Sequence, residues 1–227
     1  MPLNTAYKLP VVVLISGTGS NLQAIIDAIT HDALPVEIRA VISNRPAAEG
    51  LERARRAGIA TQTLEHGAYA DRAQFDAALT ALIDAHAPSL VVLAGFMRIL
   101  TRAFVEHYAG RLINIHPSLL PDLPGIDTHR RAIEAGLTEH GVSVHFVTPE
   151  VDGGPVIAQA RVPVRRDDNT ATLAARVLEQ EHRIYPLVLR WYAEGRLRLA
   201  DGNIQLDGKA LQQPIIYHDT GQETASC

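Results

Sequence analysis

An amide and an imidazole stand two residues apart at the end of an apolar run. In "LINIHPSLLPDLPG", residues 112–125, Asn114 and His116 alternate with isoleucines. A loop that holds Pro117, Pro121 and Pro124 follows, and we call it the proline loop. Because side chains two apart on a strand share a face, Asn114 and His116 converge at the carboxyl end of a predicted strand. There an amide donor and a titratable ring could bracket one carbonyl carbon. A histidine at the end of a strand more often has a structural role, so a catalytic role for His116 requires support from other residues.

A carboxylate that could complete this pair lies in "VDGGPV", residues 151–156. Asp152 precedes two glycines, and an aspartate that only closes a turn is the commoner explanation for this pattern. If the loop lies beside His116, however, the carboxylate would stabilise the protonated imidazole. The hypothesis is therefore a tuned acid–base pair drawn from two distant segments.

A glycine-rich loop, "SGTGSN" at residues 16–21, follows the first apolar run; we call it the phosphate loop. Its glycines permit a tight turn, and a helix that starts behind it would offer unpaired amides to a phosphate. An ordinary turn with a helix cap explains the pattern about as well. A dinucleotide site, and with it an NAD-dependent oxidoreductase, is disfavoured because Leu22 replaces the third glycine and no acidic residue ends the second strand.

Other chemistries lack their motifs. The ten histidines include no H-E-x-x-H pair, so no metal is expected, and G-x-S-x-G is absent. Cys227, the only cysteine, is the last residue, which argues against a catalytic thiol and for a reducing compartment. Core or solvated roles are expected for the remaining histidines, His129, His140, His145 and His182. The arginines of "LERARR", Arg53, Arg55 and Arg56, are expected to form a solvated helix face, with contact to an anion as the less common alternative.

Alternating strand and helix patterns must position these residues. Such an order predicts an α/β fold, a mostly parallel twisted sheet with helices on both faces. The segments 141–148 and 155–164 predict two antiparallel strands at one side, followed by a helix over 170–194 that Pro186 kinks and an Asp201-Gly202 hairpin. The other expected elements are strands at 11–16, 36–43, 59–64, 89–96 and 111–115, and helices at 20–29, 48–58, 72–86 and 101–109.

Composition restricts the class of protein. The chain has 227 residues, 47% of them hydrophobic, which suits one domain over 1–227 with an N-terminal extension at 1–9 and a flexible tail at 219–227. The net charge of −4 and the scattered basic residues argue against a nucleic-acid partner. The first apolar run is too short to cross a membrane and lacks a signal-peptide cleavage site, so we expect a cytoplasmic protein without a membrane partner.

Four stretches together resemble the folate-dependent formyltransferase family over about residues 10–213: "VVVLISGTGSNLQAII", "VVLAGFMRIL", "LINIHPSLLP" and "GVSVHFVTPEVDGGPVI". The G-x-G-S-N loop is similar to that of the glycinamide ribonucleotide branch. The resemblance implies a Rossmann-like formyltransferase fold and transfer of a formyl group from 10-formyltetrahydrofolate to the primary amine of glycinamide ribonucleotide, in purine biosynthesis. Both partners are small molecules.

The resemblance also implies roles for individual residues. The family's catalytic amide, imidazole and carboxylate fall on Asn114, His116 and Asp152. Asp127 is a mild departure, since related enzymes often carry another residue there. The remaining implied residues are Gly19, Ser20, Asn21 and Glu181 for the ribonucleotide; Arg72, Met97, Arg98, Ile99, Leu100, Asn114, Thr148, Pro149, Glu150, Val151 and Asp152 for the folate; and His129 in support.

Two relatives within the family are alternatives. A methionyl-tRNA formyltransferase would need a further C-terminal domain and a basic surface, and a formyltetrahydrofolate hydrolase would carry an N-terminal regulatory domain. Neither is expected here, although the hydrolase shares the catalytic core. The sequence leaves open whether the protein is a monomer or a homodimer, and Leu120-Pro121 is only a candidate for a cis bond.

Overall fold

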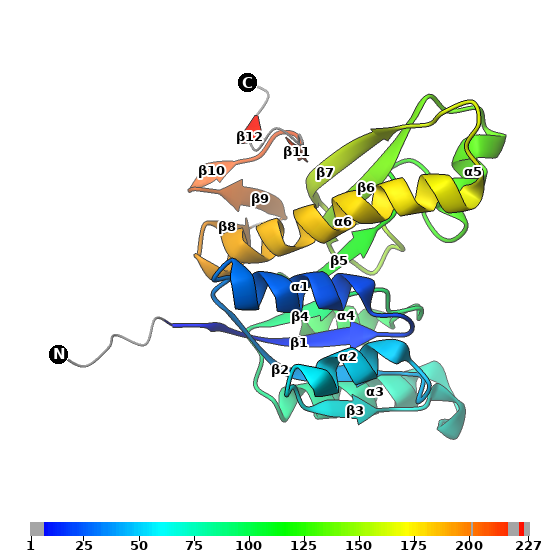
Figure 1. The fold of residues 1–227 in the computed structure, drawn as a ribbon. Coiled ribbons are helices and arrows are strands. Elements are labelled where there is room, and N and C mark those ends of the chain that lie inside the picture. Colours follow the sequence, from blue (N-terminus) through cyan, green and yellow to red (C-terminus); the bar gives the residue numbers. More distant parts are fainter. Residues whose placement is uncertain (1–6, 201, 218–222, 225–227) are drawn as a thin grey trace.

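The computed structural model describes residues 7–200, 202–217 and 223–224, and within them a nine-stranded sheet runs through the molecule (Figure 1). Its strand order is β12-β11-β7-β6-β5-β4-β1-β2-β3, and a second sheet has the order β10-β9-β8. The strands are β1 (Leu9–Ile15), β2 (Val36–Ser43), β3 (Thr61–Thr63), β4 (Leu90–Leu93), β5 (Leu112–His116), β6 (Glu139–Phe146), β7 (Val156–Pro163), β8 (Leu197–Ala200), β9 (Asn203–Leu206), β10 (Lys209–Ala210), β11 (Ile215–Tyr217) and β12 (Glu223–Thr224). The helices are α1 (Ser20–His31), α2 (Glu49–Arg56), α3 (Arg72–Asp84), α4 (Arg102–His107), α5 (Thr128–Glu134), α6 (Thr170–Ala193) and the 3-10 turn η1 (His66–Ala68).

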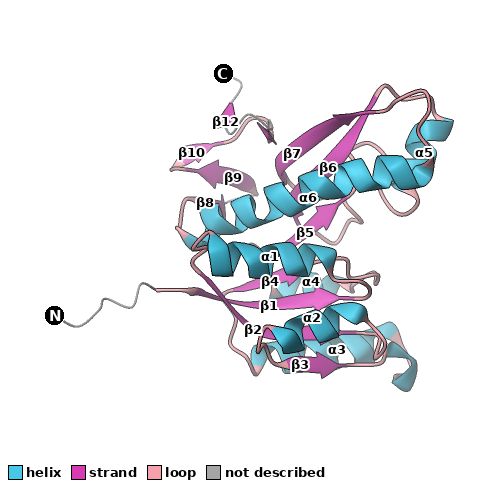
Figure 2. Cartoon of the chain, viewed as in Figure 1, coloured by secondary structure: helices cyan, strands magenta, loops and turns pink. Residues whose placement is uncertain are grey.

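Helices cover both faces of the parallel strands, as the sequence predicted (Figure 2). Alternate residues of β1 belong to different cores, because successive side chains of a strand point to opposite faces. Val11 and Val13 pack with buried residues of α1, α2 and α6, whereas Val12 and Leu14 pack with those of α3 and α4. A strand buried on both faces needs the continuous apolar run that this segment has.

The strands β6 and β7 are antiparallel to each other, which confirms the prediction. They do not end the sheet, because the short strand β11 pairs in parallel with β7. Three residues, 215–217, are too few to carry a periodic signal, and the sequence analysis missed them. It also missed α5, which begins directly after the proline loop behind Asp127, a residue with the left-handed φ of 56°.

The register of β5, β6 and β7 gathers polar side chains on one face of the sheet. Asn114 lies opposite His145, and His116 lies opposite Ser143, which in turn lies opposite Gln159. The intervening isoleucines and valines of these strands belong to the apolar core beneath α6. Cross-strand neighbours are close enough to touch, so this register places the polar side chains in one continuous stripe. The residues that flank each of them in the sequence do not reveal this arrangement.

Helix α6 ties the sheet together across its apolar face. The Asn169 side chain accepts bonds from first-turn backbone amides and thereby fixes the start of the helix. The buried Tyr185 hydroxyl lies 2.9 Å from the Leu93 carbonyl oxygen and 3.3 Å from that of Ile113, at the ends of β4 and within β5. The helix continues past Pro186 to Ala193 without a break in its assignment.

The carboxyl-terminal hairpin pairs β8 with β9 as expected. Asp201 of its predicted turn lies outside the described residues, as do residues 1–6 of the predicted extension and most of the predicted tail. Among the helices that the structure describes, none combines the length and apolar character that crossing a bilayer requires.

A prediction concerns the close approach of β6 and β7. A Cβ atom added at Gly141 would overlap the Ala160 carbonyl oxygen and lie 2.7 Å from Leu119 Cδ2. Gly141→Ala should therefore lower the free energy of unfolding by about 1–3 kcal/mol, the usual cost of overpacking. Gly67→Ala is the control, because nothing lies within 4 Å of the added atom, and it should change stability by less than about 0.5 kcal/mol. Equal urea midpoints for the two variants would contradict this packing.

Candidate active site

The amide, imidazole and carboxylate singled out from the sequence lie together at the end of β5. Asp152 reaches the site from the loop between β6 and β7, where its φ of 52° turns the chain. Its Oδ2 lies 3.5 Å from His116 Nδ1 and accepts a hydrogen bond of 2.8 Å from the Gly125 amide. The side chains of His116 and Asp152 are only 7% and 11% exposed, so little solvent screens their attraction.

Both ring nitrogens of His116 face oxygen acceptors. Nε2 lies 3.1 Å from the Leu123 carbonyl oxygen, and Nδ1 faces the Asp152 carboxylate. A neutral imidazole carries only one N–H and would point a lone pair at one of these oxygens. A ring that carried hydrogens on both nitrogens would meet an acceptor at each, at 3.1 Å on Leu123 and at 3.5 Å on Asp152.

His145 is a site residue that the sequence analysis missed. Its Nδ1 lies 3.0 Å from the Phe146 carbonyl oxygen, so that nitrogen carries the proton. Burial lowers the pKa of His145, against smaller opposing effects of the Phe146 bond and of Asp152, and the ring is neutral. Its Nε2 therefore accepts from the Asn114 side-chain nitrogen at 3.2 Å and lies 3.8 Å from Asp152 Oδ1.

This contact orients the Asn114 amide. With His145 as an acceptor, the nitrogen of Asn114 must face His145, and its second N–H remains for a ligand. The only sequence signal for His145 is its place opposite Asn114, which requires the pairing register of two strands 31 residues apart.

Buried side chains also fix the proline loop that carries Leu123. Ser143 Oγ donates to the Ser118 carbonyl oxygen at 2.7 Å and accepts from the Leu120 amide at 3.0 Å. Gln159 Nε2 donates to the Leu120 carbonyl oxygen at 2.8 Å and to Ser143 Oγ at 2.9 Å. Both backbone polar groups of Leu120 are thus held, and the Leu120-Pro121 bond is cis. The loop is positioned by side chains of β6 and β7.

His129 lies against a second histidine. His129 on α5 and His140 on β6 meet at 3.2 Å between ring nitrogens, with the rings nearly perpendicular. Burial lowers the pKa of His140 to about 4, assisted by repulsion from His129 and His116 and opposed by a bond to the Pro117 backbone. Burial, followed by His116, also lowers the pKa of His129. The structure therefore places His129 beside the site, in contact with His140.

The phosphate loop forms the start of α1 at the same edge of the sheet. Gly19 has a φ of 71° and takes the N-cap position, but no side chain caps the helix. The first amides of α1 are therefore open to an anion. A Cβ atom at Gly19 would come 2.5 Å from Gly50 Cα, so only glycine lets α2 approach the loop.

Asn21 and Glu181 bring two distant helices together beside this loop. Asn21 Nδ2 donates to Glu181 Oε2 at 2.6 Å, and both side chains are buried. Burial raises the pKa of Glu181, while the Asn21 bond opposes that rise. Asn21 Oδ1 is buried without a partner among the described residues, so it offers an acceptor to a ligand.

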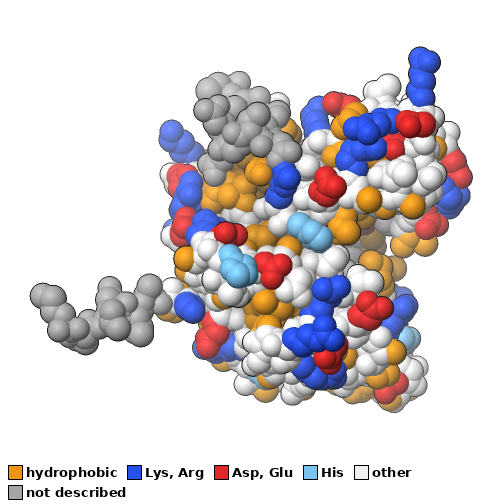
Figure 3. All heavy atoms as spheres, in the orientation of Figure 1, with side chains coloured by type: hydrophobic (Ala, Val, Ile, Leu, Met, Phe, Trp, Pro, Cys, Tyr) orange, Lys and Arg blue, Asp and Glu red, His pale blue; other side chains and the backbone are white. Residues whose placement is uncertain are grey.

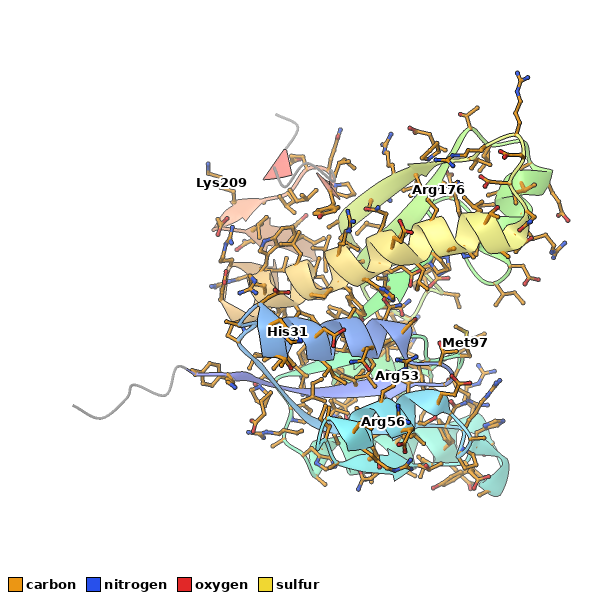
Figure 4. All side chains as sticks on the ribbon, in the orientation of Figure 1. His31, Arg53, Arg56, Met97, Arg176 and Lys209 are labelled. Carbon is orange, nitrogen blue, oxygen red and sulfur yellow. The ribbon has the colours of Figure 1, made fainter. Side chains whose placement is uncertain are left out.

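Most of the residues assigned to folate lie in the loops that follow β4 and β6, whereas Arg72 begins α3 and Asn114 lies in β5. Met97, Ile99 and Val151 expose 64%, 56% and 54% of their surfaces, so these loops present apolar side chains to the solvent. Figure 4 shows Met97 at the edge toward which β1 points. An apolar ligand laid against these side chains would remove that surface from water.

Polar atoms in the same loops lack partners within the described structure. Arg98 Nε and Thr148 Oγ1 are both buried and unsatisfied, and the Arg98 guanidinium lies 4.9 Å from the centre of the Phe75 ring. The exposed Arg72 is the first residue of α3, the helix that carries Phe75. Of the other assigned residues, Leu100 is half-buried against the α3 and α4 core, Pro149 is half-buried, and the exposed Glu150 lies 3.9 Å from Arg102.

No group of three or more histidine, cysteine, aspartate or glutamate side chains in the described ranges could hold a metal ion.

A prediction about pH follows from His140. Its folded-state pKa of about 4 lies below the ordinary value of 6.5, so between these values the unfolded chain binds a proton that the folded chain does not. This residue's contribution to stability should be full above pH 6.5 and be lost as the pH falls toward 4. His140→Gln should therefore unfold at a urea concentration closer to that of the unsubstituted protein in acid than at neutral pH. Parallel pH profiles for the two proteins would contradict the assignment.

The Formyl transferase family matches residues 9–189 of the chain. The chain is 60% identical over 201 residues to the phosphoribosylglycinamide formyltransferase of Escherichia coli (strain K12), covering 88% of this chain and 95% of that protein. It is also 46% identical over 194 residues to the trifunctional purine biosynthetic protein adenosine-3 of Homo sapiens, covering 86% of this chain and 19% of that longer protein.

Solved structures agree with this match. The phosphoribosylglycinamide formyltransferase of Coxiella burnetii superposes with a TM-score of 0.87 at 55% identity, covering 90% of this chain and 96% of that one. Glycinamide ribonucleotide transformylase 1 of Symbiobacterium toebii gives a TM-score of 0.85 at 45% identity, covering 88% and 95%. With the family match spanning most of the described chain, this protein belongs to the formyl transferase family.

Proposed function

We propose that this protein transfers the formyl group of 10-formyltetrahydrofolate to the primary amine of glycinamide ribonucleotide, a step of purine biosynthesis. The observation that carries the proposal is the meeting of Asn114, His116 and Asp152 at one strand end, with an uncapped helix start at the same sheet edge. The enzymes named for this reaction in Escherichia coli and Haemophilus influenzae are 60% and 49% identical to the chain. The expected cytoplasmic location and the choice between monomer and homodimer stay predictions.

The residues present fit a formyl folate. The exposed apolar side chains of Met97, Ile99 and Val151 would cover the ring system, and the unpaired Arg98 Nε and Thr148 Oγ1 would find partners on its polar atoms. The co-substrate supplies an electrophilic carbonyl carbon; everything else in the step falls to the protein and the amine.

Asn114 and His116 stabilise negative charge on the carbonyl oxygen as the amine attacks. The second N–H of Asn114 is a remaining donor whose orientation is set before the reaction by His145. Protonated His116, whose two N–H groups face Leu123 and Asp152, adds a positive charge beside the developing oxyanion. Fixed donors in a shielded site need no reorganisation when charge develops. Loss of one such donor costs on the order of 10²–10³ in rate.

Asp152 stabilises protonated His116 and accepts the proton that the attacking amine loses. Its carboxylate lies 3.5 Å from His116 Nδ1, which is long for a direct hydrogen bond, suits an ion pair and is too short for a water between the two atoms. In this proposal a water bonded to the carboxylate lies beside the pair. Through that water the attacking amine can lose its proton to the carboxylate. The leaving nitrogen can then be protonated from the same group, so the step needs no covalent enzyme intermediate.

The ribonucleotide is oriented at its phosphate and its ribose. The amides at the start of α1 and the Ser20 hydroxyl suit the phosphate, while Asn21 Oδ1 and Glu181 are placed to accept from the ribose hydroxyls. These contacts hold the amine at a defined distance from the reacting carbon.

The direct test is an assay with both substrates, in which each is omitted in turn. Consumption of the formyl folate should require glycinamide ribonucleotide. Consumption without the ribonucleotide would instead support the hydrolase alternative, and dependence on a nicotinamide cofactor would overturn the family of reactions proposed.

Asp152→Asn tests the proton-transfer role. Asparagine can still accept the Gly125 amide, so the loop should keep its shape, but it cannot stabilise protonated His116 or take up a proton. We expect kcat to fall about 10²–10⁴-fold with both KM values nearly unchanged. Asp122→Asn, an exposed change in the neighbouring loop, is the control and should keep normal turnover. A normal kcat for Asp152→Asn would rule out the role.

His145→Leu tests the orientation of Asn114. Leucine fills similar space but offers no acceptor, so kcat should fall roughly tenfold to hundredfold. In an Asn114→Ala background the same change should cost almost nothing further, because the contact that it removes is already lost. Independent, additive losses in the double variant would mean that His145 acts in another way.

A further inference from the structure

Helix α2 is packed directly against the phosphate loop. The Gly50 amide donates to the Gly17 carbonyl oxygen at 3.1 Å, and a Cβ atom at Gly50 would lie 3.0 Å from Gly19 Cα. One turn further on, Arg53 Nε donates to the Thr18 carbonyl oxygen at 2.8 Å. Two consecutive loop carbonyls are therefore held by α2, and their partners are a backbone amide and one charged side chain.

Arg53 differs from the two arginines that follow it. Arg55 and Arg56 are exposed and lie 3.4 Å and 3.0 Å from the Glu52 carboxylate, as a solvated helix face would. Arg53 is half-buried, and among the described residues its terminal guanidinium nitrogens have no hydrogen bond or ion pair. Arg53 thus differs from a purely solvated helix face, because its Nε is bonded to the loop. Basic side chains gather over α2 in the space-filling view (Figure 3), and Figure 4 labels Arg53 and Arg56 there.

A groove of about 490 Å³ connects Arg53 with the start of α1 and with α6. Ser20 and His182 line it, together with the opposing charge of Asp27. Burial lowers the pKa of His182, and Arg53 lowers it further against Asp27, so this histidine is neutral. Arg53 is the basic side chain of this groove for which a direct hydrogen bond to the loop is seen, while Asp27 accepts from Gln23 Nε2 at 2.9 Å.

We infer that Arg53 is the residue that makes the phosphate loop selective for a phosphorylated substrate. Its Nε–H holds the Thr18 carbonyl so that the amides of residues 19–21 point outward, and its unpaired guanidinium nitrogens add a positive charge beside them. The inference rests on the proposed function. It identifies Arg53 as a positioning residue for the phosphate of the ribonucleotide, outside the groups that react.

Phosphate binding at the loop should gain from having the Arg53 guanidinium beside the amides of α1. An uncapped helix start carries only partial positive charge, and its interaction with a dianion weakens in water. A fixed guanidinium in partly buried surroundings adds a full charge and an orienting hydrogen bond. Its removal should weaken phosphate binding without moving the catalytic groups at the end of β5.

The experiment compares steady-state kinetics of Arg53→Gln with those of Arg56→Gln, which removes the same charge three residues along the same helix. Arg53→Gln should raise the KM for glycinamide ribonucleotide roughly tenfold to hundredfold, the change expected for loss of a charged hydrogen bond. Its kcat and the KM for the formyl folate should stay within about twofold of normal. Arg56→Gln should leave all three values unchanged.

Two further arms separate this role from a structural one. With glycinamide riboside, which lacks the phosphate, the unsubstituted protein and Arg53→Gln should have the same kcat/KM. Arg53→Lys, which keeps the charge but not the planar fork, should recover part of the affinity for the ribonucleotide, and the recovery should shrink as salt is added.

The inference is overturned if Arg53→Gln and Arg56→Gln have equal KM values, or if Arg53→Gln loses as much activity on the riboside as on the ribonucleotide. A fall in kcat at unchanged KM would also overturn it. Failure of the proposed function looks different, because the unsubstituted protein would then not consume formyl folate with the ribonucleotide at all.

Discussion

The pairing of β5 with β6 and β7 is the constraint on which the site depends. It sets Asn114 against His145 and His116 against Ser143, and so brings the Asn114 amide into contact with the His145 ring. A slip of one residue would turn this polar stripe toward the apolar core under α6 and expose the isoleucines of β5 instead. The burial of those isoleucines thus fixes the geometry of the polar face as a consequence of the hydrophobic pattern.

Polar groups buried at this stripe are nearly all paired, as they must be in a poorly solvated region. The unpaired buried atoms of Asn21, Arg98 and Thr148 lie in loops assigned to the two substrates, where a ligand can satisfy them. Ser143 and Gln159 donate hydrogen bonds to carbonyl oxygens of the proline loop, and the Leu123 carbonyl of this loop faces His116. The strands β6 and β7 therefore help to position the His116 imidazole, because their side chains hold the proline loop that contacts it.

Much of this could be predicted from the sequence because the signals are local. Alternating apolar runs predicted the parallel sheet, and the rule that ligands bind at strand ends led to Asn114, His116 and the phosphate loop. The resemblance to formyltransferases added Glu181, which no local pattern would associate with Asn21. The roles of these residues remain proposals that the experiments above address.

The features that escaped prediction depend on contacts between distant segments. His145 looked like any strand histidine, since its partner lies on another strand and only the register joins them. Arg53 lies on α2 near two exposed arginines, and the sequence of α2 does not indicate that the loop after β1 packs against Arg53. The strand β11 and helix α5 are too short for periodicity and depend on the sheet edge and the proline loop beside them.

The central claim is that the Asp152 carboxylate and the Leu123 carbonyl together hold a doubly protonated His116. Nitrogen NMR of the protein labelled at its histidine rings, recorded near neutral pH, tests it most directly. Two protonated nitrogens with attached hydrogens at His116, reduced to one when Asp152 is replaced by asparagine, is the predicted result. A lone-pair nitrogen at Nδ1 of His116 in the unsubstituted protein would contradict the account.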